Sequence, residues 1–418
     1  MKYVIIGNST AAVGCIEGIR SVDNKGEIAV ISSEQHHTYS RPLISYLLQG
    51  KTDLERMKYR DNNFYEKNAC TLLLSQTATK INSSVRSVQL SEGEAVPYDR
   101  LLIATGSVPL IPPTPGQGTV KKQFTFLSLD DADALKKATG PDSRVLIIGA
   151  GLIGLKCAEG LHGRVKSIKV VDMADRILPS ILDPEGSTLV QRHLEKEGIL
   201  FYLSDTVSEY SGNTAALKSG VEIGFDVLVT AVGVRPNVSL AQNAGIEIRR
   251  GILTDSTGRT NLDGIYAAGD CCESHDISSD ENRVLALLPN AYLQGECAGV
   301  NMAGGEKVFD NAIPMNAIGF WGLHIQSAGT YTGDVYRENT KQEYKLLYTK
   351  DGVLKGFIRI GKELSATGIY TALIRNRTPL DSIDFELICK KPQFMAFAAE
   401  KRREMFGITP GEEEGYLL

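Results

Sequence analysis

The sequence contains few cysteines, and they show none of the spacings that form a metal site or a disulfide framework. The seven cysteines are odd in number and lack both C-x-x-C and C-x-x-x-x-C spacing. These absences argue against a disulfide scaffold, a zinc site and an iron-sulfur site. We therefore expect reduced, mostly buried thiols and no metal.

Long apolar runs and an excess of positive charge are also missing. No apolar run approaches the roughly 20 residues of a membrane helix, and a net charge of −5 gives nucleic acid or an anionic membrane no general attraction. The apolar start at residues 3–6 is broken by Gly7-Asn8-Ser9-Thr10, so it lacks the h-region and cleavage site of a signal peptide. The sequence predicts a cytoplasmic protein without nucleic-acid or membrane partners.

The 418 residues are 42% apolar and 23% charged, which is ordinary for a globular protein of two to three domains. The clearest motif lies at residues 144–172, where an apolar β-branched run leads into Gly149-Ala150-Gly151-Leu152-Ile153-Gly154 and then a helical pattern. Gly149 allows the tight turn, Gly151 lets a pyrophosphate approach the helix N-terminus, and Gly154 lets the helix pack on the strand. Asp172, about 20 residues on, can accept ribose hydroxyls. The spacing predicts a dinucleotide site.

A second, weaker fingerprint opens the chain. Residues 2–6 form an apolar strand, and the turn that follows has Gly7, then Ser9 for the second glycine and Ala12 for the third. Glu34, just beyond the next expected strand at residues 28–31, can bind a ribose. An ordinary βαβ turn fits this pattern as well as a nucleotide site does. Two such units in one chain suggest two dinucleotides that face each other.

Three further segments carry candidate ligand contacts. In Arg41-Pro42 a rigid proline can hold the guanidinium against a phosphate or a flavin edge, although a surface ion pair fits equally. A buried strand ends at Thr105-Gly106, where a backbone can come close to a ligand. Another strand ends at Gly269-Asp270, and this carboxylate either accepts a ligand hydroxyl or caps a following helix. His36 and His37 are interpreted as part of a solvated loop.

Together these motifs resemble the pyridine nucleotide-disulfide oxidoreductase superfamily. The motifs are residues 7–12 with Glu34, 104–106, 149–154 with Asp172, 233–237 and 260–270. The resemblance implies an α/β fold with two Rossmann-like domains, in which an NAD(P)H domain (114–240) is inserted in a discontinuous FAD domain (1–113 and 241–324). A C-terminal α+β interface domain (325–418) follows, as in related reductases. A homodimer is a further possibility that this domain suggests.

The resemblance also implies the cofactors FAD and NADH and their binding residues. Asp270 would contact the flavin ribitol. The residues expected at FAD are Gly7, Ser9, Ala12, Glu34, Arg41, Pro42, Thr105, Gly106 and Asp270. Those expected at NADH are Gly149, Gly151, Gly154, Asp172 and Gly233.

Within the superfamily, residues 38–42 and 288–295 look most like NADH:rubredoxin reductases, ferredoxin reductases and the flavin portion of NADH-dependent nitrite reductases. The superfamily's C-x-x-x-x-C is absent, and no cysteine stands near Arg41, where CoA-disulfide reductases and NADH oxidases carry one. The expected function is electron transfer from NADH through FAD to a small iron-sulfur carrier such as rubredoxin or ferredoxin. The alternatives are an NADH oxidase that uses oxygen and a flavin-binding subunit of a larger redox complex.

Two positions beside the flavin depart from the family. In similar ferredoxin reductases a lysine stands where this sequence has Tyr46 and a glutamate where it has Lys156, and the two form an ion pair near the flavin. Since an unpaired buried charge is costly, we expect both positions to have changed together, with Lys156 supplying the cation and Tyr46 a neutral ring as catalytic residues. A lysine that reaches solvent between the domains is the alternative.

The C-terminal segment has its own patterns. Lys350-Asp351-Gly352 indicates a hairpin, residues 366–375 and 393–406 should be helices, and residues 411–418 should be a flexible tail. Lys390, Lys391, Lys401, Arg402 and Arg403 make the region locally basic, which suits either an acidic carrier or a solvated face. The adjacent Cys271-Cys272 pair follows Asp270, so a redox-active pair near the flavin is one alternative. A disulfide between neighbouring cysteines requires a strained peptide, which favours packing for Cys271.

Overall fold

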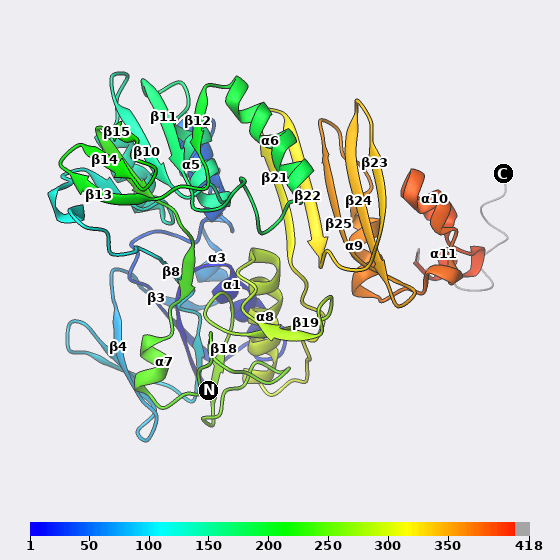
Figure 1. Cartoon of the computed structure of the whole chain (residues 1–418). Coiled ribbons are helices and arrows are strands. Elements are labelled where there is room, and N and C mark those ends of the chain that lie inside the picture. The colour runs from blue at the N-terminus through cyan, green and yellow to red at the C-terminus, as the bar shows by residue number, and fades with distance from the viewer. Residues whose placement is uncertain (406–418) are drawn as a thin grey trace. The chain divides into compact units, whose positions relative to one another are not determined.

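The structure is a computed structural model that describes residues 1–405, and its internal contacts divide the chain into two compact units (Figure 1). The first unit contains Met1–His275 and Asn282–Asp310. The second contains Asp276–Glu281 and the chain from Asn311 onward. The finer division into four segments stays a prediction.

A parallel five-stranded sheet of order β18-β7-β1-β2-β3 organises the first part of unit 1. Its strands are β1 (Lys2–Ile6), β2 (Glu27–Ile31), β3 (Cys70–Leu73), β7 (Arg100–Ile103) and β18 (Ile265–Ala267). Tyr3 and Ile5 enter one buried cluster while Val4 and Ile6 enter another. Strands of this kind are apolar throughout because both faces of the sheet are covered.

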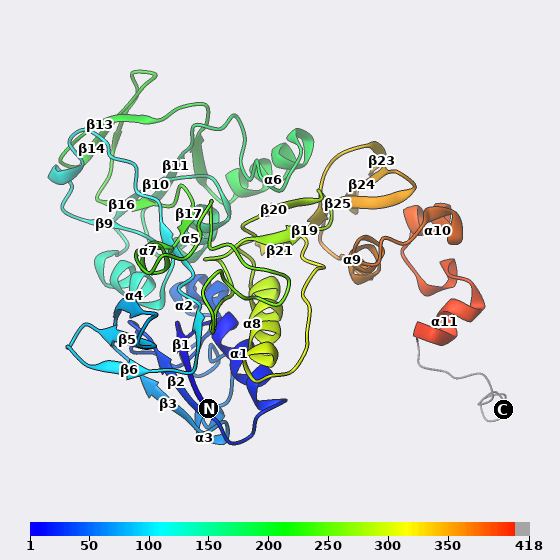
Figure 2. The ribbon, with the colours of Figure 1, turned by 90° about the horizontal axis from the view of Figure 1, so that it is seen from below.

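Two helices cross closely on one face of this sheet. They are α1 (Thr10–Arg20) and α8 (Leu288–Met302), which run side by side in both views (Figure 2). A Cβ atom added at Gly14 would lie 2.3 Å from the carbonyl oxygen of Tyr292, and one at Gly295 would lie 2.0 Å from that of Ala11. The two backbones can approach this far only because both helices carry glycine at the crossing.

The second parallel sheet has the order β12-β11-β10-β16-β9. Its strands are β9 (Gln123–Phe124), β10 (Arg144–Ile148), β11 (Ser167–Val171), β12 (Ile199–Tyr202) and β16 (Val227–Thr230). Its helices are α4 (Leu129–Ala138), α5 (Leu152–Leu161) and α6 (Pro184–Lys196). All its strands lie in sequence between β7 and β18, so a second Rossmann-like sheet interrupts the first, as predicted.

Shorter elements connect and extend the two sheets. Antiparallel β8 (Ser107–Pro109) and β17 (Val234–Pro236) join the strand ends of the two sheets. The remaining short elements of unit 1 are η1 (Arg41–Leu43), α2 (Ile44–Gln49), α3 (Phe64–Lys67), β4 (Ala78–Asn82), β5 (Ser87–Leu90), β6 (Ala95–Pro97), η2 (Gln117–Thr119), β13 (Val207–Ser211), β14 (Thr214–Leu217), β15 (Glu222–Gly224) and α7 (Ser239–Asn243). The strands β19 (Ser274–Asp276) and β20 (Glu281–Arg283) lie where the chain passes between units.

Unit 2 is built on an antiparallel sheet of order β21-β22-β25-β24-β23. The strands are β21 (Met315–Phe320), β22 (Leu323–Gly329), β23 (Asp334–Asn339), β24 (Glu343–Lys350) and β25 (Val353–Gly361), and the hairpin predicted at residues 350–352 is confirmed. The helical elements are α9 (Thr367–Arg375), η3 (Leu380–Ser382), α10 (Phe385–Lys390), η4 (Phe394–Ala396) and α11 (Ala399–Met405).

The single helix predicted over residues 393–406 is wrong. The structure has the short η4 and α11, separated by Phe397, whose backbone is extended and pairs with Ile383. Phe397 is buried in the core of unit 2, and this burial stabilises the break in a segment with helical propensity. The predicted flexible tail at 411–418 lies outside the described residues.

Candidate functional site

Residues that follow four strand ends of the first sheet line one cavity of about 560 Å³. Residues 7–11 follow β1, residues 32–34 follow β2, residues 104–109 follow β7, and residues 268–270 follow β18. The sheet order reverses beside β1. Open α/β sheets bind their ligands at the carboxyl ends of strands next to such a reversal.

The first turn of the cavity wall combines a strained glycine with an uncapped helix. Gly7 has a φ of +117°, and a Cβ atom there would lie 2.1 Å from the carbonyl oxygen of Ala104. Ser9 is the N-cap residue of α1, yet its side chain makes no capping bond and instead accepts from Nε of Arg41 at 3.3 Å. The first N–H groups of α1 are thus left for an anion such as a pyrophosphate.

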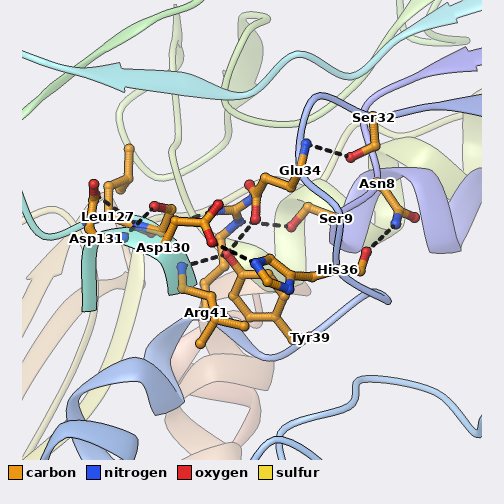
Figure 3. Close-up of polar contacts among 12 residues, drawn as sticks. Asn8, Ser9, Ser32, Glu34, His36, Tyr39, Arg41, Leu127, Asp130 and Asp131 are labelled. Atoms are coloured by element: carbon orange, nitrogen blue, oxygen red, sulfur yellow. Dashed lines mark hydrogen bonds and ion pairs between the residues drawn. The ribbon is translucent and has the colours of Figure 1, made fainter. Parts of the chain in front are cut away.

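Glu34 and Arg41 form an ion pair in this wall, with 2.5 Å between Oε1 and Nη2 (Figure 3). The Tyr39 hydroxyl donates to the other carboxylate oxygen of Glu34 at 2.7 Å. Burial alone would lower the pKa of the Arg41 guanidinium, but the neighbouring Tyr39 and Glu34 raise it, so Arg41 stays charged. Arg41 is therefore a fixed cation at the cavity rather than a solvated surface residue.

Asp270 lies at the carboxyl end of β18 and accepts from the Ser107 hydroxyl at 3.2 Å. Burial raises the pKa of this carboxyl group, against the opposing effects of Ser107 and Arg41. Gln294 of α8 holds the preceding residue, because its Oε1 accepts from the Gly269 N–H at 2.6 Å. The helix-cap interpretation of Asp270 is wrong, since the next helix, α8, begins at Leu288.

Seven of the nine residues predicted at FAD line this cavity, and two do not. The seven are Gly7, Ser9, Glu34, Arg41, Thr105, Gly106 and Asp270. Ala12 belongs to α1 and is buried in the core, and Pro42 is exposed at the start of the short η1 helix. The roles of all nine residues in FAD binding stay predictions.

The second fingerprint adopts the same turn at the end of β10. Gly149 has a φ of +112°, and Gly151 is the N-cap of α5, with open space where a Cβ atom would lie. Asp172 directly follows β11, and its Oδ2 accepts from the Ala150 N–H at 2.6 Å. The predicted NADH residues therefore meet at one turn, apart from Gly233, which follows β16 with a φ of +118°. Binding of NADH by these residues stays a prediction.

Lys156 and Tyr46 lie together where α5 packs against α2. The Lys156 ammonium is 4.7 Å from the centre of the Tyr46 ring and forms an ion pair with Glu159 of its own helix. Sequence reasoning missed this carboxylate. Neither Lys156 nor Tyr46 lines the 560 Å³ cavity, and their role beside a flavin stays a prediction.

The Cys271 and Cys272 thiols are free and buried. Cys271 donates to the carbonyl oxygen of Ile103 at 3.4 Å, and Cys272 donates to that of Gly269 at 3.3 Å. Burial raises the pKa of both thiols, which keeps them protonated. Both cysteines are thus free, buried thiols in this structure, and the packing role of Cys271 stays a prediction.

Like His37, His36 lies in the loop between β2 and η1, as the sequence indicates, but it is only partly exposed and has a side-chain partner. Its Nε2 lies 2.7 Å from Oδ1 of Asp130, and its side chain is only 23% exposed. The partner segment carried a local signal, because Ser128 and Asp131 form a capping box at the start of α4. That signal predicts where α4 begins, but it does not predict that His36 contacts this helix.

Among residues 1–405 no helix is long and apolar enough to cross a membrane. In the same residues no group of three or more His, Cys, Asp or Glu side chains is arranged to hold a metal ion.

Two Rossmann-like sheets with glycine turns at their switch points define a two-dinucleotide oxidoreductase. The family model described as pyridine nucleotide-disulphide oxidoreductase matches residues 1–295, and the chain belongs to this family. It is an FAD-dependent NAD(P)H oxidoreductase. The described residues fit FAD, because the N-terminus of α1 has no side-chain cap and Glu34, Arg41 and Asp270 line the cavity.

Individual relatives span most of the chain. The epsilon subunit of NADH-dependent phenylglyoxylate dehydrogenase from Aromatoleum evansii is 30% identical over 392 residues, which are 91% of this chain and 92% of that protein. The NADH-rubredoxin oxidoreductase of Clostridium acetobutylicum is 26% identical over 378 residues, which are 89% of this chain and 94% of that protein. By contrast, the chain spans only 44% and 49% of two relatives from Bacillus subtilis.

Solved structures give the same fold. The covalent complex of putidaredoxin reductase with putidaredoxin has a TM-score of 0.86 and covers 97% of this chain and 98% of that chain, at 22% identity. At this identity the likeness shows the fold alone.

Proposed function

We propose that the chain takes electrons from NADH through FAD and passes them singly to a small iron-sulfur protein such as rubredoxin or ferredoxin. The observation that carries the proposal is the cavity wall, whose lining residues include no cysteine. With no thiol pair to receive them, the electrons have to leave directly for an external acceptor. Similarity to an NADH-rubredoxin oxidoreductase over nearly its whole length supports this acceptor class.

In this proposal each glycine turn binds one dinucleotide. Residues 149–154 and Asp172 hold NADH, while Gly7, Ser9 and Arg41 hold the FAD pyrophosphate. Glu34 and Asp270 accept hydroxyl groups of the adenosine ribose and the flavin ribitol, and the backbone at Thr105-Gly106 borders the flavin. The cofactors themselves supply hydride transfer and one-electron release. What this chain contributes is their position, their electrostatic surroundings and the exclusion of water.

A second candidate is an electron-transfer subunit of a larger redox complex. It is favoured by the 30% identity to an epsilon subunit of a dehydrogenase, with more than nine-tenths of both chains covered. In that case the electrons would pass to a neighbouring subunit instead of a free carrier. A homodimer and a cytoplasmic location stay predictions under either candidate.

The test compares electron acceptors under anaerobic conditions. The purified FAD-loaded protein should turn over steadily with NADH and ferricyanide, and it should reduce rubredoxin or ferredoxin faster than it consumes oxygen in a parallel aerobic assay. Oxygen consumption as fast as carrier reduction would favour the oxidase. Turnover with ferricyanide but with neither carrier, together with capture of a redox partner from an anaerobic lysate, would favour the subunit.

A further inference from the structure

Two segments that are about 90 residues apart in sequence meet at one side of the FAD cavity (Figure 3). Residues 36–41 follow β2, and residues 127–130 contain the start of α4. Both contribute to the cavity wall, the first through His36, Tyr39 and Arg41 and the second through Leu127 and Ser128. A ligand in this cavity is therefore bordered by both segments.

Tyr39 is the centre of the contact between them. Its side chain is 7% exposed, and its hydroxyl donates to Oε2 of Glu34 at 2.7 Å while accepting from the Leu129 N–H at 3.0 Å. Leu129 is the first residue of α4, so this N–H has no acceptor within the helix. Burial raises the pKa of the Tyr39 phenol, which keeps it protonated as a donor.

Two further contacts flank Tyr39. Nη1 of Arg41 donates to the carbonyl oxygen of Leu127 at 3.4 Å, and the Arg41 guanidinium lies 5.1 Å from the centre of the Tyr39 ring. On the other side, Nε2 of His36 lies 2.7 Å from Oδ1 of Asp130. The Arg41–Leu127 and His36–Asp130 contacts join the same two segments, whereas the Arg41–Tyr39 contact lies within the first segment.

The α4 side of this contact is rigid without any help from a ligand. The Asp131 carboxylate accepts from the N–H groups of Leu127 and Ser128 at 2.8 and 3.1 Å, and the Ser128 hydroxyl caps the helix in return. These bonds are made within the segment and do not involve FAD, and such internal bonds lower the entropy that a segment loses on binding.

We propose that His36, Tyr39 and Arg41, together with residues 127–130, form a clasp that retains FAD, and that Tyr39 positions Glu34 toward the adenosine ribose. The clasp rests on the assignment of the cavity to FAD under the proposed function. A carboxylate has about four acceptor sites, so Glu34 can hold Tyr39 and Arg41 and still accept a ribose hydroxyl. Tyr39 is a positioning residue, because it acts on the cofactor through Glu34.

The test measures how fast FAD leaves the protein. Holoprotein is diluted, flavin release is followed by its fluorescence, and the FAD dissociation constant is measured by titrating apoprotein. Tyr39→Phe removes both hydroxyl contacts and should speed FAD release about tenfold. Asp130→Asn, at the more exposed end of the clasp, should speed it about twofold.

Tyr98→Phe is the matched control. Tyr98 belongs to unit 1, as Tyr39 does, and is 3% exposed. Its hydroxyl has no hydrogen-bond partner. This variant should leave FAD release unchanged. If Tyr98→Phe speeds release as much as Tyr39→Phe does, loss of any buried tyrosine hydroxyl explains the effect, and the clasp is rejected.

A double variant separates positioning from general destabilisation. If Tyr39 acts through Glu34, Tyr39→Phe should add less than twofold to the FAD dissociation constant of Glu34→Ala, whereas additive effects would overturn the positioning role. Unchanged FAD release in Tyr39→Phe would overturn the clasp while leaving the proposed function intact. A wild-type protein that binds no added FAD would overturn both.

Discussion

The two glycine turns of unit 1 start from unequal sequences and reach the same backbone geometry. Gly7 and Gly149 have φ values of +117° and +112°, and a Cβ atom at either would lie 2.1 or 2.3 Å from a carbonyl oxygen of the neighbouring strand end. The second glycine position of the fingerprint is occupied by Ser9 in the first turn and by Gly151 in the second, so it accepts either residue type. The comparison shows that only the first glycine of the fingerprint is required by the backbone in both units.

At the third glycine position of the fingerprint, the packing of the helix against the turn determines which residue fits. A Cβ atom at Gly154 would lie 2.0 Å from the carbonyl oxygen of Gly149, whereas Ala12 stands at the matching place and is fully buried. The degenerate first fingerprint therefore forms the same turn, and its third position has room for the methyl group of Ala12. Its weakness as a sequence signal is therefore not matched by a different backbone angle at the first glycine.

The helices after the two turns share three further positions. Cysteine, glutamate and glycine stand eight, ten and eleven residues after Gly7 and again after Gly149. Glu17 binds Arg60 and the Tyr292 hydroxyl of α8, while Glu159 pairs with Lys156 of its own helix beside α2. The same local sequence pattern thus packs against α8 in the first helix and against α2 in the second.

The largest effect should come from the first glycine of each turn. Gly7→Ala and Gly149→Ala combine a positive φ with a backbone clash, so each should lower the free energy of unfolding by about 3 kcal/mol. Gly93→Ala is the control, because Gly93 has a φ of +89° with no atom within 4 Å, and it should cost about 1 kcal/mol. Urea denaturation measures all three. Equal losses would mean that the carbonyl contacts are irrelevant.

Removing the cation partner of Glu159 should cost more stability than removing that of Glu17, because Glu159 is buried more deeply. Glu159 is 4% exposed and Glu17 is 30% exposed. Lys156→Met should therefore cost roughly 2 kcal/mol of stability and Arg60→Met about 1 kcal/mol. Adding Glu159→Gln to Lys156→Met should recover most of the loss in thermal or urea unfolding.

Lys156→Met also tests the predicted role beside the flavin. Loss of a nearby cation should lower the flavin midpoint potential and slow reduction by NADH, because it removes stabilisation of the reduced, anionic cofactor. The Lys156→Met, Glu159→Gln double variant separates this from instability. If that stable double variant keeps both the potential and the rate, Lys156 has no role beside the flavin.

The shared glycine of the two helices should respond unequally to alanine. A Cβ atom at Gly18 would lie 2.4 Å from the backbone oxygen of Glu296 in α8, whereas one at Gly160 would first meet a methyl group of Leu48 and the Ser45 oxygen at 3.1 Å. Gly18→Ala should cost about 1.5 kcal/mol and Gly160→Ala less than about 1 kcal/mol. Chemical denaturation of the pair gives the comparison, and a reversed order would contradict it.

The last difference concerns nucleotide choice at the second turn. Asp172 can accept a ribose 2′-hydroxyl and would repel a 2′-phosphate, so NADH should be preferred over NADPH. Asp172→Ala should reduce this preference in kcat/KM by about tenfold, or about 1.4 kcal/mol. The exposed Asp175→Ala is the control and should leave the ratio unchanged. Equal or better efficiency of the wild type with NADPH would reject the assignment.

The sequence by itself determined the two turns and the strands that carry them. Positive φ at Gly7 and Gly149 and the apolar runs of β1 and β10 are local properties, so the pattern of residues predicts them directly. The sequence also predicted that Asp172 and Asp270 follow strands, and hence that each lies at the carboxyl ends of the strands of its sheet.

Only the tertiary structure decided which distant groups meet these turns. The Tyr39 bond to Leu129, the glycine crossing of α1 with α8 and the extended Phe397 all join segments far apart in sequence. Periodicity and spacing report on neighbours along one helix or strand. They hold no information about which partner satisfies a buried hydroxyl or covers a helix face, because close packing and hydrogen bonding of the folded chain select that partner.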